Sequence, residues 1–321
     1  MKKNVIKSYA LVFLTLLVLL TSCISSQSWV PVKGSGESVD KGYNVSDFQG
    51  IEVSGGFDVI LVQGNSEAVT LTTQENLFDY ITVKVEQGML KIYTENNIMS
   101  TRPMKARISF KSIDKLRVSG GGDVTAETPV QVPELSFELS GGGDITSVIN
   151  TSRLYGHISG GGDVDIDGII KDYDFELSGG GDIDSEISAG TVSCRISGGG
   201  NLTVRNREKA SLATLDINGG GDMDVEMNAE KMRCSVSGGG DATLTGQADE
   251  LDININGGGN IHAGNFVTHI TSFQASGGSD IYVNASEEIT GQISGGGDVY
   301  YSGTAERINI DAKGGSEIHK Q

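Results

Sequence analysis

The stretch FELSGGGDIDSE (residues 175–186) contains a motif, SGGGD, that recurs along most of this chain. Identical copies lie at 119–123, 140–144, 159–163, 237–241 and 294–298, and close variants occupy most of the gaps. Aligned on the closing residue, twelve copies end at Asp58, Asp123, Asp144, Asp163, Asp182, Asn201, Asp222, Asp241, Asn260, Asp280, Asp298 and Glu317. From Asp123 onward they are 18 to 21 residues apart, most often 19. Such a period is too short for propeller blades or helix-pair repeats and indicates one turn of a β-solenoid.

The residues on both sides of the glycines alternate between apolar and polar. Five positions before the closing residue every copy has an apolar side chain, as in Leu177 and Ile196, and so does the position directly after it, as in Ile183. The intervening positions are polar, and this period of two is the signature of a half-buried strand. Each coil is therefore predicted to be a strand, a glycine corner, a second strand and a return segment of variable length.

The sequence thus predicts an all-β chain whose residues 111–321 form a single-stranded, right-handed parallel β-helix. The handedness follows because about 98% of crossovers between parallel strands are right-handed. Residues 43–110 contain only the first copy, and we expect irregular coils there, with strands at 69–73, 81–85 and 89–93, that cap the N-terminal end. An open strand edge at 317–321 would allow end-to-end association with a second copy, although Lys320 favours a blunted edge.

Glycine loses more conformational entropy on folding than any other residue, so its use 46 times requires a reason. The first two glycines of the motif occur in all twelve copies, and the third is replaced only by Phe57, Ser279 and Ser316. A sharp corner in every coil requires either positive φ or a close approach of stacked backbones. Glycine meets both requirements without steric cost.

The residues that close each copy of the motif, called the closing column below, have two interpretations. Gly-Gly-x-Asp repeats resemble the calcium-binding nonapeptide solenoids, and a Ca²⁺ ladder would use Asp144, Asp163 and Asp182. Those solenoids have two such corners per turn, whereas this chain has one, and Asn201 and Asn260 share with Asp the ability to accept hydrogen bonds but carry no charge. We therefore favour a structural turn lock that accepts backbone N–H groups and needs no cofactor. Its members are Asp123, Asp144, Asp163, Asp182, Asn201, Asp222, Asp241, Asn260, Asp280 and Asp298.

A row of aromatic residues stands two positions after the closing residue in four successive coils. It comprises His262, Tyr282, Tyr300 and His319, on the outward side of the predicted strand. An exposed row of rings would offer a binding platform for sugar rings or a protein partner. The alternative is that the rings only stabilise neighbouring strands.

A catalytic function has less support in the sequence than a binding function. Polysaccharide lyases and pectinases share the β-helix form and need clustered carboxylates, some of them beside Arg or Lys. Acids do gather at Asp165, Asp167, Asp172, Asp174, Glu176, Asp184 and Glu186, with Lys171 as the only base among them, which indicates a solvated acidic face.

The two cysteines of the repeat region, Cys194 and Cys234, occupy one inward column two coils apart. That separation is about 9.6 Å from the strand spacing. A disulfide needs Cα atoms within about 7 Å. We therefore predict two free, buried thiols.

The N-terminus predicts export. Lys2, Lys3 and Lys7 precede an apolar run to Leu20 that is too short for a stable membrane span and is typical of a signal peptide over 1–22. Leu20-Thr21-Ser22-Cys23 resembles the lipobox of bacterial lipoproteins, which implies that Cys23 carries the lipid, with acyl chains such as palmitate. Residues 23–42 would then be the lipidated cysteine and a flexible tether.

Charge limits the choice of partner. Loss of residues 1–22 would change the net charge from −18 to −21, because that segment holds three lysines and no acid. Nucleic acid and anionic membrane surfaces are therefore poor partners, since both need clustered Lys and Arg.

The lipobox, the stretch DFQGIEVSGGFDVILVQG (47–64) and the serial S/N-G-G-G-D/N copies together resemble the bacterial head GIN domain family, common in Bacteroidetes and also described as auto-transporter adhesin heads. The resemblance covers residues 43–321, implies a right-handed β-helix in the cell envelope and supplies no catalytic residues. We expect a non-enzymatic, lipid-anchored envelope protein, placed at the outer membrane, whose β-helix faces bind a glycan or an envelope protein. A carbohydrate-active enzyme and a Ca²⁺-stiffened rod are the alternatives.

Overall fold

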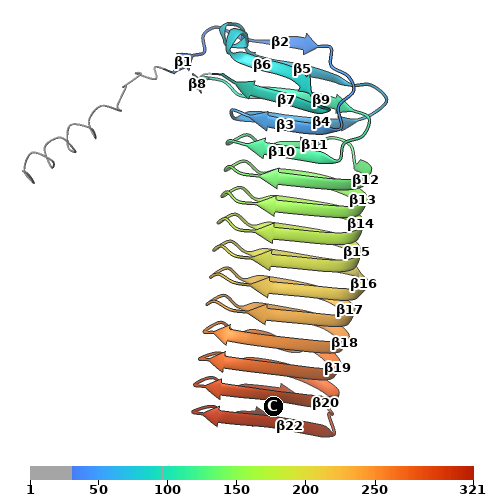
Figure 1. Ribbon diagram of the computed structural model, residues 1–321, viewed down its shortest axis with the longest axis vertical. Helices are drawn as coiled ribbons and strands as arrows, with labels where there is room; N and C mark the ends of the chain where they lie inside the picture. The colour runs from blue at the N-terminus through green and yellow to red at the C-terminus, as the bar shows by residue number, and fades with distance from the viewer. Residues whose placement is uncertain (1–30, 96) are drawn as a thin grey trace, which may run out of the picture.

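The computed structural model describes residues 31–95 and 97–321, of which 69% are in β-strands and 2% in helix (Figure 1). The signal peptide, the lipobox and Cys23 lie outside the described residues. Among those described, no helix is long and apolar enough to cross a bilayer.

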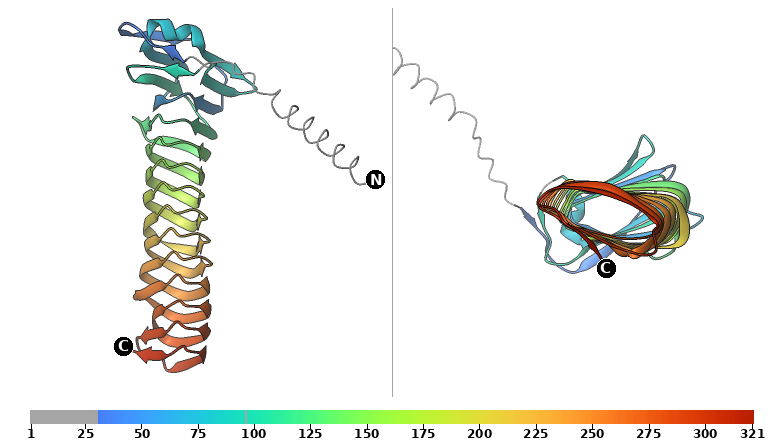
Figure 2. Two further views of the ribbon diagram at one scale, coloured as in Figure 1. Left: turned by 90° about the vertical axis from the view of Figure 1, so that its left-hand side faces the viewer. Right: turned by 90° about the horizontal axis from the view of Figure 1, so that it is seen from below.

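The chain winds as a right-handed β-solenoid of about 11 turns with coils of about 19 residues, as the sequence predicts (Figure 1). Viewed along the axis, the coils superimpose into one flattened outline (Figure 2). The first coils are formed by β3 (Gly50–Ser54), β4 (Phe57–Gln63), β10 (Lys115–Ser119), β11 (Val124–Ala126) and β12 (Val130–Leu139). The regular coils follow as β13 (Ile145–Ile158), β14 (Val164–Leu177), β15 (Ile183–Ile196), β16 (Leu202–Ile217), β17 (Met223–Val236), β18 (Ala242–Gly257), β19 (Ile261–Gly277), β20 (Ile281–Gly295), β21 (Val299–Ser302), β22 (Arg307–Gly314) and β23 (Ile318–Lys320).

Equivalent residues of successive coils pair in parallel register. Leu177 pairs with Ile196, which pairs with Ile217, and all three are fully buried. The apolar columns therefore form one continuous core inside the solenoid. Full burial of each such side chain contributes about 1.5–3 kcal/mol.

The glycine corners form one edge of the solenoid, where the strand arrows end at the left of Figure 1. In a central corner, a Cβ on Gly179 would lie 1.8 Å from the carbonyl oxygen of Gly160, and one on Gly181 would lie 2.0 Å from that of Gly162. The middle glycine, Gly180, has no such neighbour within 4 Å, and its φ lies outside the left-handed range. Close approach of stacked backbones therefore explains the first and third glycines of this corner. Neither close approach nor a positive φ explains the middle one.

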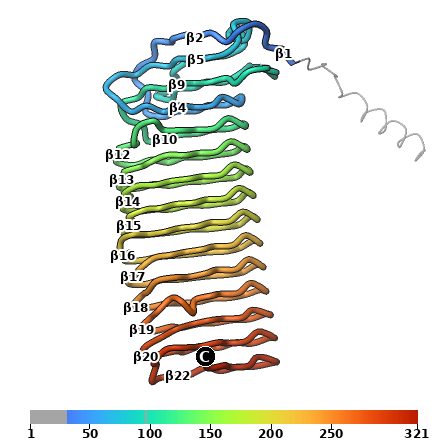
Figure 3. The backbone as a smooth tube through the Cα atoms, turned by 180° about the vertical axis from the view of Figure 1, so that it is seen from behind, coloured from blue at the N-terminus to red at the C-terminus, as the bar shows by residue number. Residues whose placement is uncertain are grey.

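The N-terminal end is closed by a cap. It contains β1 (Val32–Lys33), β2 (Ser38–Tyr43), β5 (Ala68–Gln74), the 3₁₀ helix η1 (Glu75–Tyr80), β6 (Ile81–Glu86), β7 (Met89–Thr94), β8 (Ile98–Met99) and β9 (Met104–Phe110). Strands β7 and β9 pair in parallel with β3 and β4 of the first coil, and β6 pairs antiparallel with β7. Strand β5 pairs antiparallel with β9, and β2 with β5, so β9, β5 and β2 follow one another beyond β4 (Figure 3). The strands predicted at 81–85 and 89–93 are present as an antiparallel pair, and the turn between them has Gln87 and Gly88 at positive φ. This change to antiparallel pairing ends the parallel stack, and Leu77 and Phe78 of η1 are buried in the cap.

The prediction of a flexible tether over residues 23–42 is wrong from Val32 onward. Strand β1 pairs with β8, and β2 pairs antiparallel with β5. The buried amide of Gln74 secures this segment: its Nε2 donates to the Gly36 carbonyl at 3.0 Å, while its Oε1 accepts from Thr101. Strand β2 has almost no apolar face, so its pairing partner, rather than its own composition, makes it a strand.

Cys194 and Cys234 are free and buried, as predicted. Each pairs with Leu215 of the coil between them, which confirms the two-coil separation. Burial raises the pKa of both thiols, that of Cys234 to about 12.

We predict opposite effects for alanine at adjacent positions of one corner. Gly179→Ala forces a Cβ against the carbonyl oxygen of the preceding coil and should destabilise the protein by about 1–3 kcal/mol or more. Gly180→Ala meets no atom and reduces the entropy of the unfolded chain, so stability should be unchanged or higher by about 0.4–1 kcal/mol. Denaturant unfolding of both variants tests this, and equal losses would contradict the backbone-contact explanation.

We also predict that neither buried thiol reacts in the folded protein. The thiolate is the reactive form, so iodoacetamide at about pH 8 should label Cys194 and Cys234 only after unfolding. Peptide mapping by mass spectrometry measures both sites. Rapid labelling in native buffer, or a Cys194–Cys234 bridge, would refute the register.

Candidate functional site

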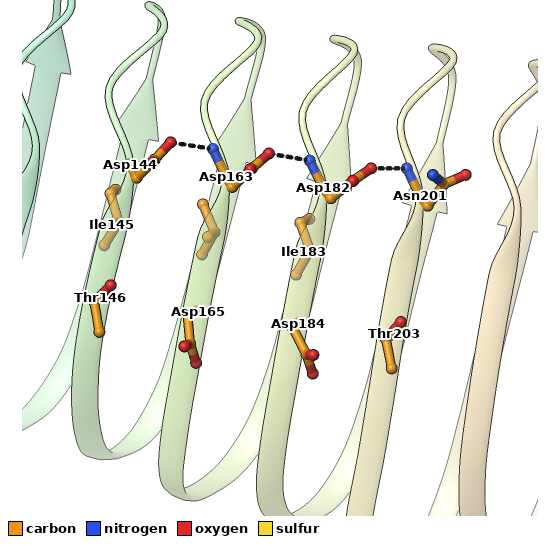
Figure 4. Close-up of a pocket in the computed structure, with 11 residues that line it drawn as sticks. Asp144, Ile145, Thr146, Asp163, Asp165, Asp182, Ile183, Asp184, Asn201 and Thr203 are labelled. Carbon is orange, nitrogen blue, oxygen red and sulfur yellow. Dashed lines mark hydrogen bonds between the residues drawn. The ribbon is translucent and has the colours of Figure 1, made fainter.

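The closing column forms a ladder of hydrogen bonds that joins the coils. The backbone N–H of Asp163 donates to Oδ1 of Asp144, that of Asp182 to Asp163, and that of Asn201 to Asp182, each at 2.8 Å (Figure 4). The same bond recurs between successive closing residues from Asp123 to Glu317. Each side chain thus accepts from the next coil rather than from its own turn.

The two asparagines of the column make the same bond. Oδ1 of Asn201 accepts from Asp222, and Oδ1 of Asn260 accepts from Asp280. An amide oxygen therefore replaces a carboxylate oxygen without loss of the ladder, which indicates that hydrogen-bond acceptance is the shared requirement of this column.

The calcium alternative gains no support from this geometry. Within residues 31–95 and 97–321, no group of three or more His, Cys, Asp or Glu side chains could hold a metal ion. Asp144, Asp163 and Asp182 line an open depression of about 490 Å³, and their carboxylates are spread along the axis, one in each coil (Figure 4). Ca²⁺ takes about six to eight oxygen ligands at a single point.

The cluster of acidic residues between Asp165 and Glu186 has more basic residues beside it than the sequence suggested. Arg205 binds Asp184 at 3.0 Å and Arg207 binds Glu186 at 2.5 Å. Both arginines come from the following coil, 21 residues later, so Lys171 is not the only base near this cluster. Asp165 has no ion pair within the described residues. Desolvation, followed by the charges of Asp167, Asp184 and Glu186, raises its pKa.

The four aromatic residues come together in one continuous stack. His262, Tyr282, Tyr300 and His319 pair in register on successive coils. Their ring centroids are 5.1, 4.6 and 4.9 Å apart, and the interplanar angles are 27°, 7° and 18°. All four side chains are partly exposed.

This stacking changes what the row can offer to a ligand. Each ring covers the face of its neighbour, so the partly exposed Tyr282 and Tyr300 offer ring edges rather than ring faces to a ligand. A sugar ring cannot stack on a face that another ring already covers. The expected flat platform is therefore a polar stripe, beside which stands the acidic column of Asp280, Asp298 and Glu317, two residues earlier in each coil.

Sequence reasoning missed a second row of the same coils. Six positions before the closing residue stand Asn254, Gln274 and Gln292, on the strand that precedes each glycine corner. They line two adjoining depressions of about 540 and 360 Å³. The available signal was a change of composition in this column, from charged residues in the earlier coils to neutral amides in the later ones.

A family model described as "Putative auto-transporter adhesin, head GIN domain" matches residues 47–214 and 209–305. Among solved structures, a "putative adhesin" from Parabacteroides merdae is 17% identical, covers 90% of this chain and 98% of its own, and has a TM-score of 0.40. A "putative lipid binding protein" from Parabacteroides distasonis is 20% identical, with 91% and 100% coverage and a TM-score of 0.38. A "putative adhesin" from Bacteroides fragilis is 19% identical, with 90% and 100% coverage and a TM-score of 0.34. No curated protein matches the chain.

We predict that Asp165→Asn stabilises the protein at neutral pH. A raised folded-state pKa means that the folded protein disfavours the ionised carboxyl, and the amide removes this penalty. The gain should disappear as pH falls below the ordinary Asp pKa of 3.8, where both states are protonated. Thermal unfolding against pH measures the effect.

Asp184→Asn is the matched comparison in the next coil. It removes an exposed ion pair with Arg205, worth about 0–1 kcal/mol, so it should give no gain at neutral pH. Equal gains for both variants would show that general acid repulsion, rather than the environment of Asp165, causes the effect.

Proposed function

The chain belongs to the head GIN domain family, and we propose that it is a non-enzymatic, adhesin-like binding protein of the cell envelope. In this proposal a lipid on Cys23 anchors the chain, at the outer membrane, and the last coils of the solenoid contact a glycan or an envelope protein. The N-terminal cap then lies on the membrane side of the solenoid, since it directly follows the anchor segment (Figure 1).

The stack of His262, Tyr282, Tyr300 and His319 carries the proposal. The fold does not require rings at this position, because the same row contains only threonine and aspartate in the seven preceding coils. Those residues are Thr125, Thr146, Asp165, Asp184, Thr203, Asp224 and Thr243. A stripe of four rings at the far end of a regular scaffold is therefore better explained by contact with a partner than by stability.

The exposed edges define the chemistry of that contact. Tyrosine hydroxyls donate and accept hydrogen bonds, and the neighbouring carboxylates accept them. Desolvation and the charge of Asp298 raise the pKa of Tyr300, so its hydroxyl, which is protonated at neutral pH in any case, keeps its proton to a higher pH than an ordinary tyrosine. Such a stripe suits a partner that is rich in hydroxyl or amide groups.

We predict that Tyr282→Ser with Tyr300→Ser abolishes binding while the solenoid stays folded. The double variant removes both hydroxyl-bearing ring edges and interrupts the stack. Retention of the purified chain by a glycan array and by immobilised envelope proteins measures binding, and circular dichroism measures the fold. The expected result is loss of at least tenfold in retention with native β-structure.

The matched control changes the same row where no rings stand. Thr146→Ser with Thr203→Ser preserves the polar surface of the earlier coils and should leave retention unchanged. If the tyrosine variant binds as well as the wild type, the aromatic stripe is not the contact surface.

A further inference from the structure

We propose that the face containing Asn254, Gln274 and Gln292 is a second binding site, for an uncharged, polyhydroxylated chain such as a neutral polysaccharide. The proposal extends the binding function above, but it does not depend on the aromatic stripe. The two rows lie on opposite faces of the flattened solenoid, because the chain reverses direction at the glycine corner between them (Figure 2).

The first argument is a change of chemistry along one row. In the earlier coils this row contains alternating charges that pair between coils: Arg117 with Glu138 at 2.9 Å, and Arg195 with Asp216 at 3.4 Å. From Ser235 to Gln292 the row is neutral. The change occurs in the same coils that introduce the aromatic stripe on the other face.

The second argument is the shape of the surface. The amide row separates the two depressions of about 540 and 360 Å³, and Asn254, Gln274 and Gln292 line both of them. The larger depression extends from the coil of Ser235 to that of Asp311. Four coil spacings of about 4.8 Å give a length of about 19 Å along the axis. A shallow, elongated surface of this kind fits an extended chain better than a compact small molecule.

The third argument is free hydrogen-bonding capacity. Among the described residues, no side-chain hydrogen bond involves the amides of Asn254, Gln274 or Gln292, whereas neighbouring hydroxyls of the same face are engaged. Ser272 donates to Asp252 at 2.5 Å, and Ser276 donates to Asn256 at 3.3 Å. A side-chain amide offers two donors and an oxygen acceptor, which together match neighbouring hydroxyl groups of a sugar.

Charge and burial then select the ligand class. The acids at the border are already paired: Asp252 with Lys231 at 2.9 Å, and Asp311 with Lys313 at 2.7 Å. A cation therefore finds no free carboxylate among the lining residues, and a polyanion meets a protein of net charge −18. The apolar residues beneath the face, Ile253 and Phe273, are buried, so it offers little to an apolar partner. The ligand class that these exclusions leave is a neutral, hydroxyl-rich chain.

The test is affinity electrophoresis of the full chain through gels that contain dextran, galactomannan or polygalacturonate. We expect at least one of the two neutral polysaccharides to retard the wild-type chain and polygalacturonate not to do so. The triple variant Asn254→Ala, Gln274→Ala, Gln292→Ala should weaken that retardation at least tenfold. As a matched control, Ser136→Ala, Ser193→Ala and Thr214→Ala remove polar side chains from the same face in earlier coils and should have no effect.

A second variant keeps the test valid if the triple alanine variant fails to fold. Gln274→Glu introduces a charge that the equivalent positions Glu138 and Glu176 already tolerate, so it should fold and still weaken retardation. Absence of retardation by both neutral polysaccharides, retardation by polygalacturonate alone, or full retardation of both amide variants would overturn the proposal. Tyr282→Ser with Tyr300→Ser should leave this retardation intact, so failure of the amide face and failure of the aromatic stripe are distinguishable.

Discussion

The architecture depends on the distance between stacked backbones at one edge. The first and third glycines of a regular corner place their Cα atoms against carbonyl oxygens of the preceding coil, and a Cβ in the central corners would lie only about 2 Å from those oxygens. At that approach the corner backbones also bond directly, as when Gly180 N–H donates to the Gly160 carbonyl at 3.0 Å. The corners can therefore stack at the strand spacing, and every strand that leaves a corner is held in register with its neighbours.

The closing column supports the same edge by a second interaction. A side-chain oxygen of each closing residue binds the backbone N–H of the next one, so the coils are joined both through the glycine backbones and through this ladder. Carboxylates about 4.8 Å apart repel one another by roughly 1 kcal/mol in water-like surroundings. Hydrogen bonds to charged groups contribute about 1.5–3 kcal/mol each, which offsets that repulsion. The column can therefore be rich in aspartate without a metal ion.

Because the edge and the inward columns hold the fold, the outward rows are free to vary. The same outward position accommodates Thr203, Asp184 and Tyr282, and another accommodates Arg195, Glu176 and Gln274. In the last coils both faces change together, to stacked rings on one side and free amides on the other. A scaffold of this kind separates stability from recognition, which is consistent with an adhesin-like role for the family.

The sequence by itself determined the solenoid, its period, the inward columns and the two free thiols. It could do so because each residue's direction, inward or outward, follows from its distance along the chain to the nearest corner.

Only the tertiary structure decided how residues one coil apart meet. It showed that the middle glycine of the corner is open, that the aspartate ladder joins coils and that Arg205 reaches Asp184. It also showed that tyrosine rings cover each other's faces and that residues 32–33 and 38–43 form strands of the cap. These contacts join positions about 19 or more residues apart, and their geometry depends on side-chain orientation and on pairing partners, which a repeat pattern does not encode.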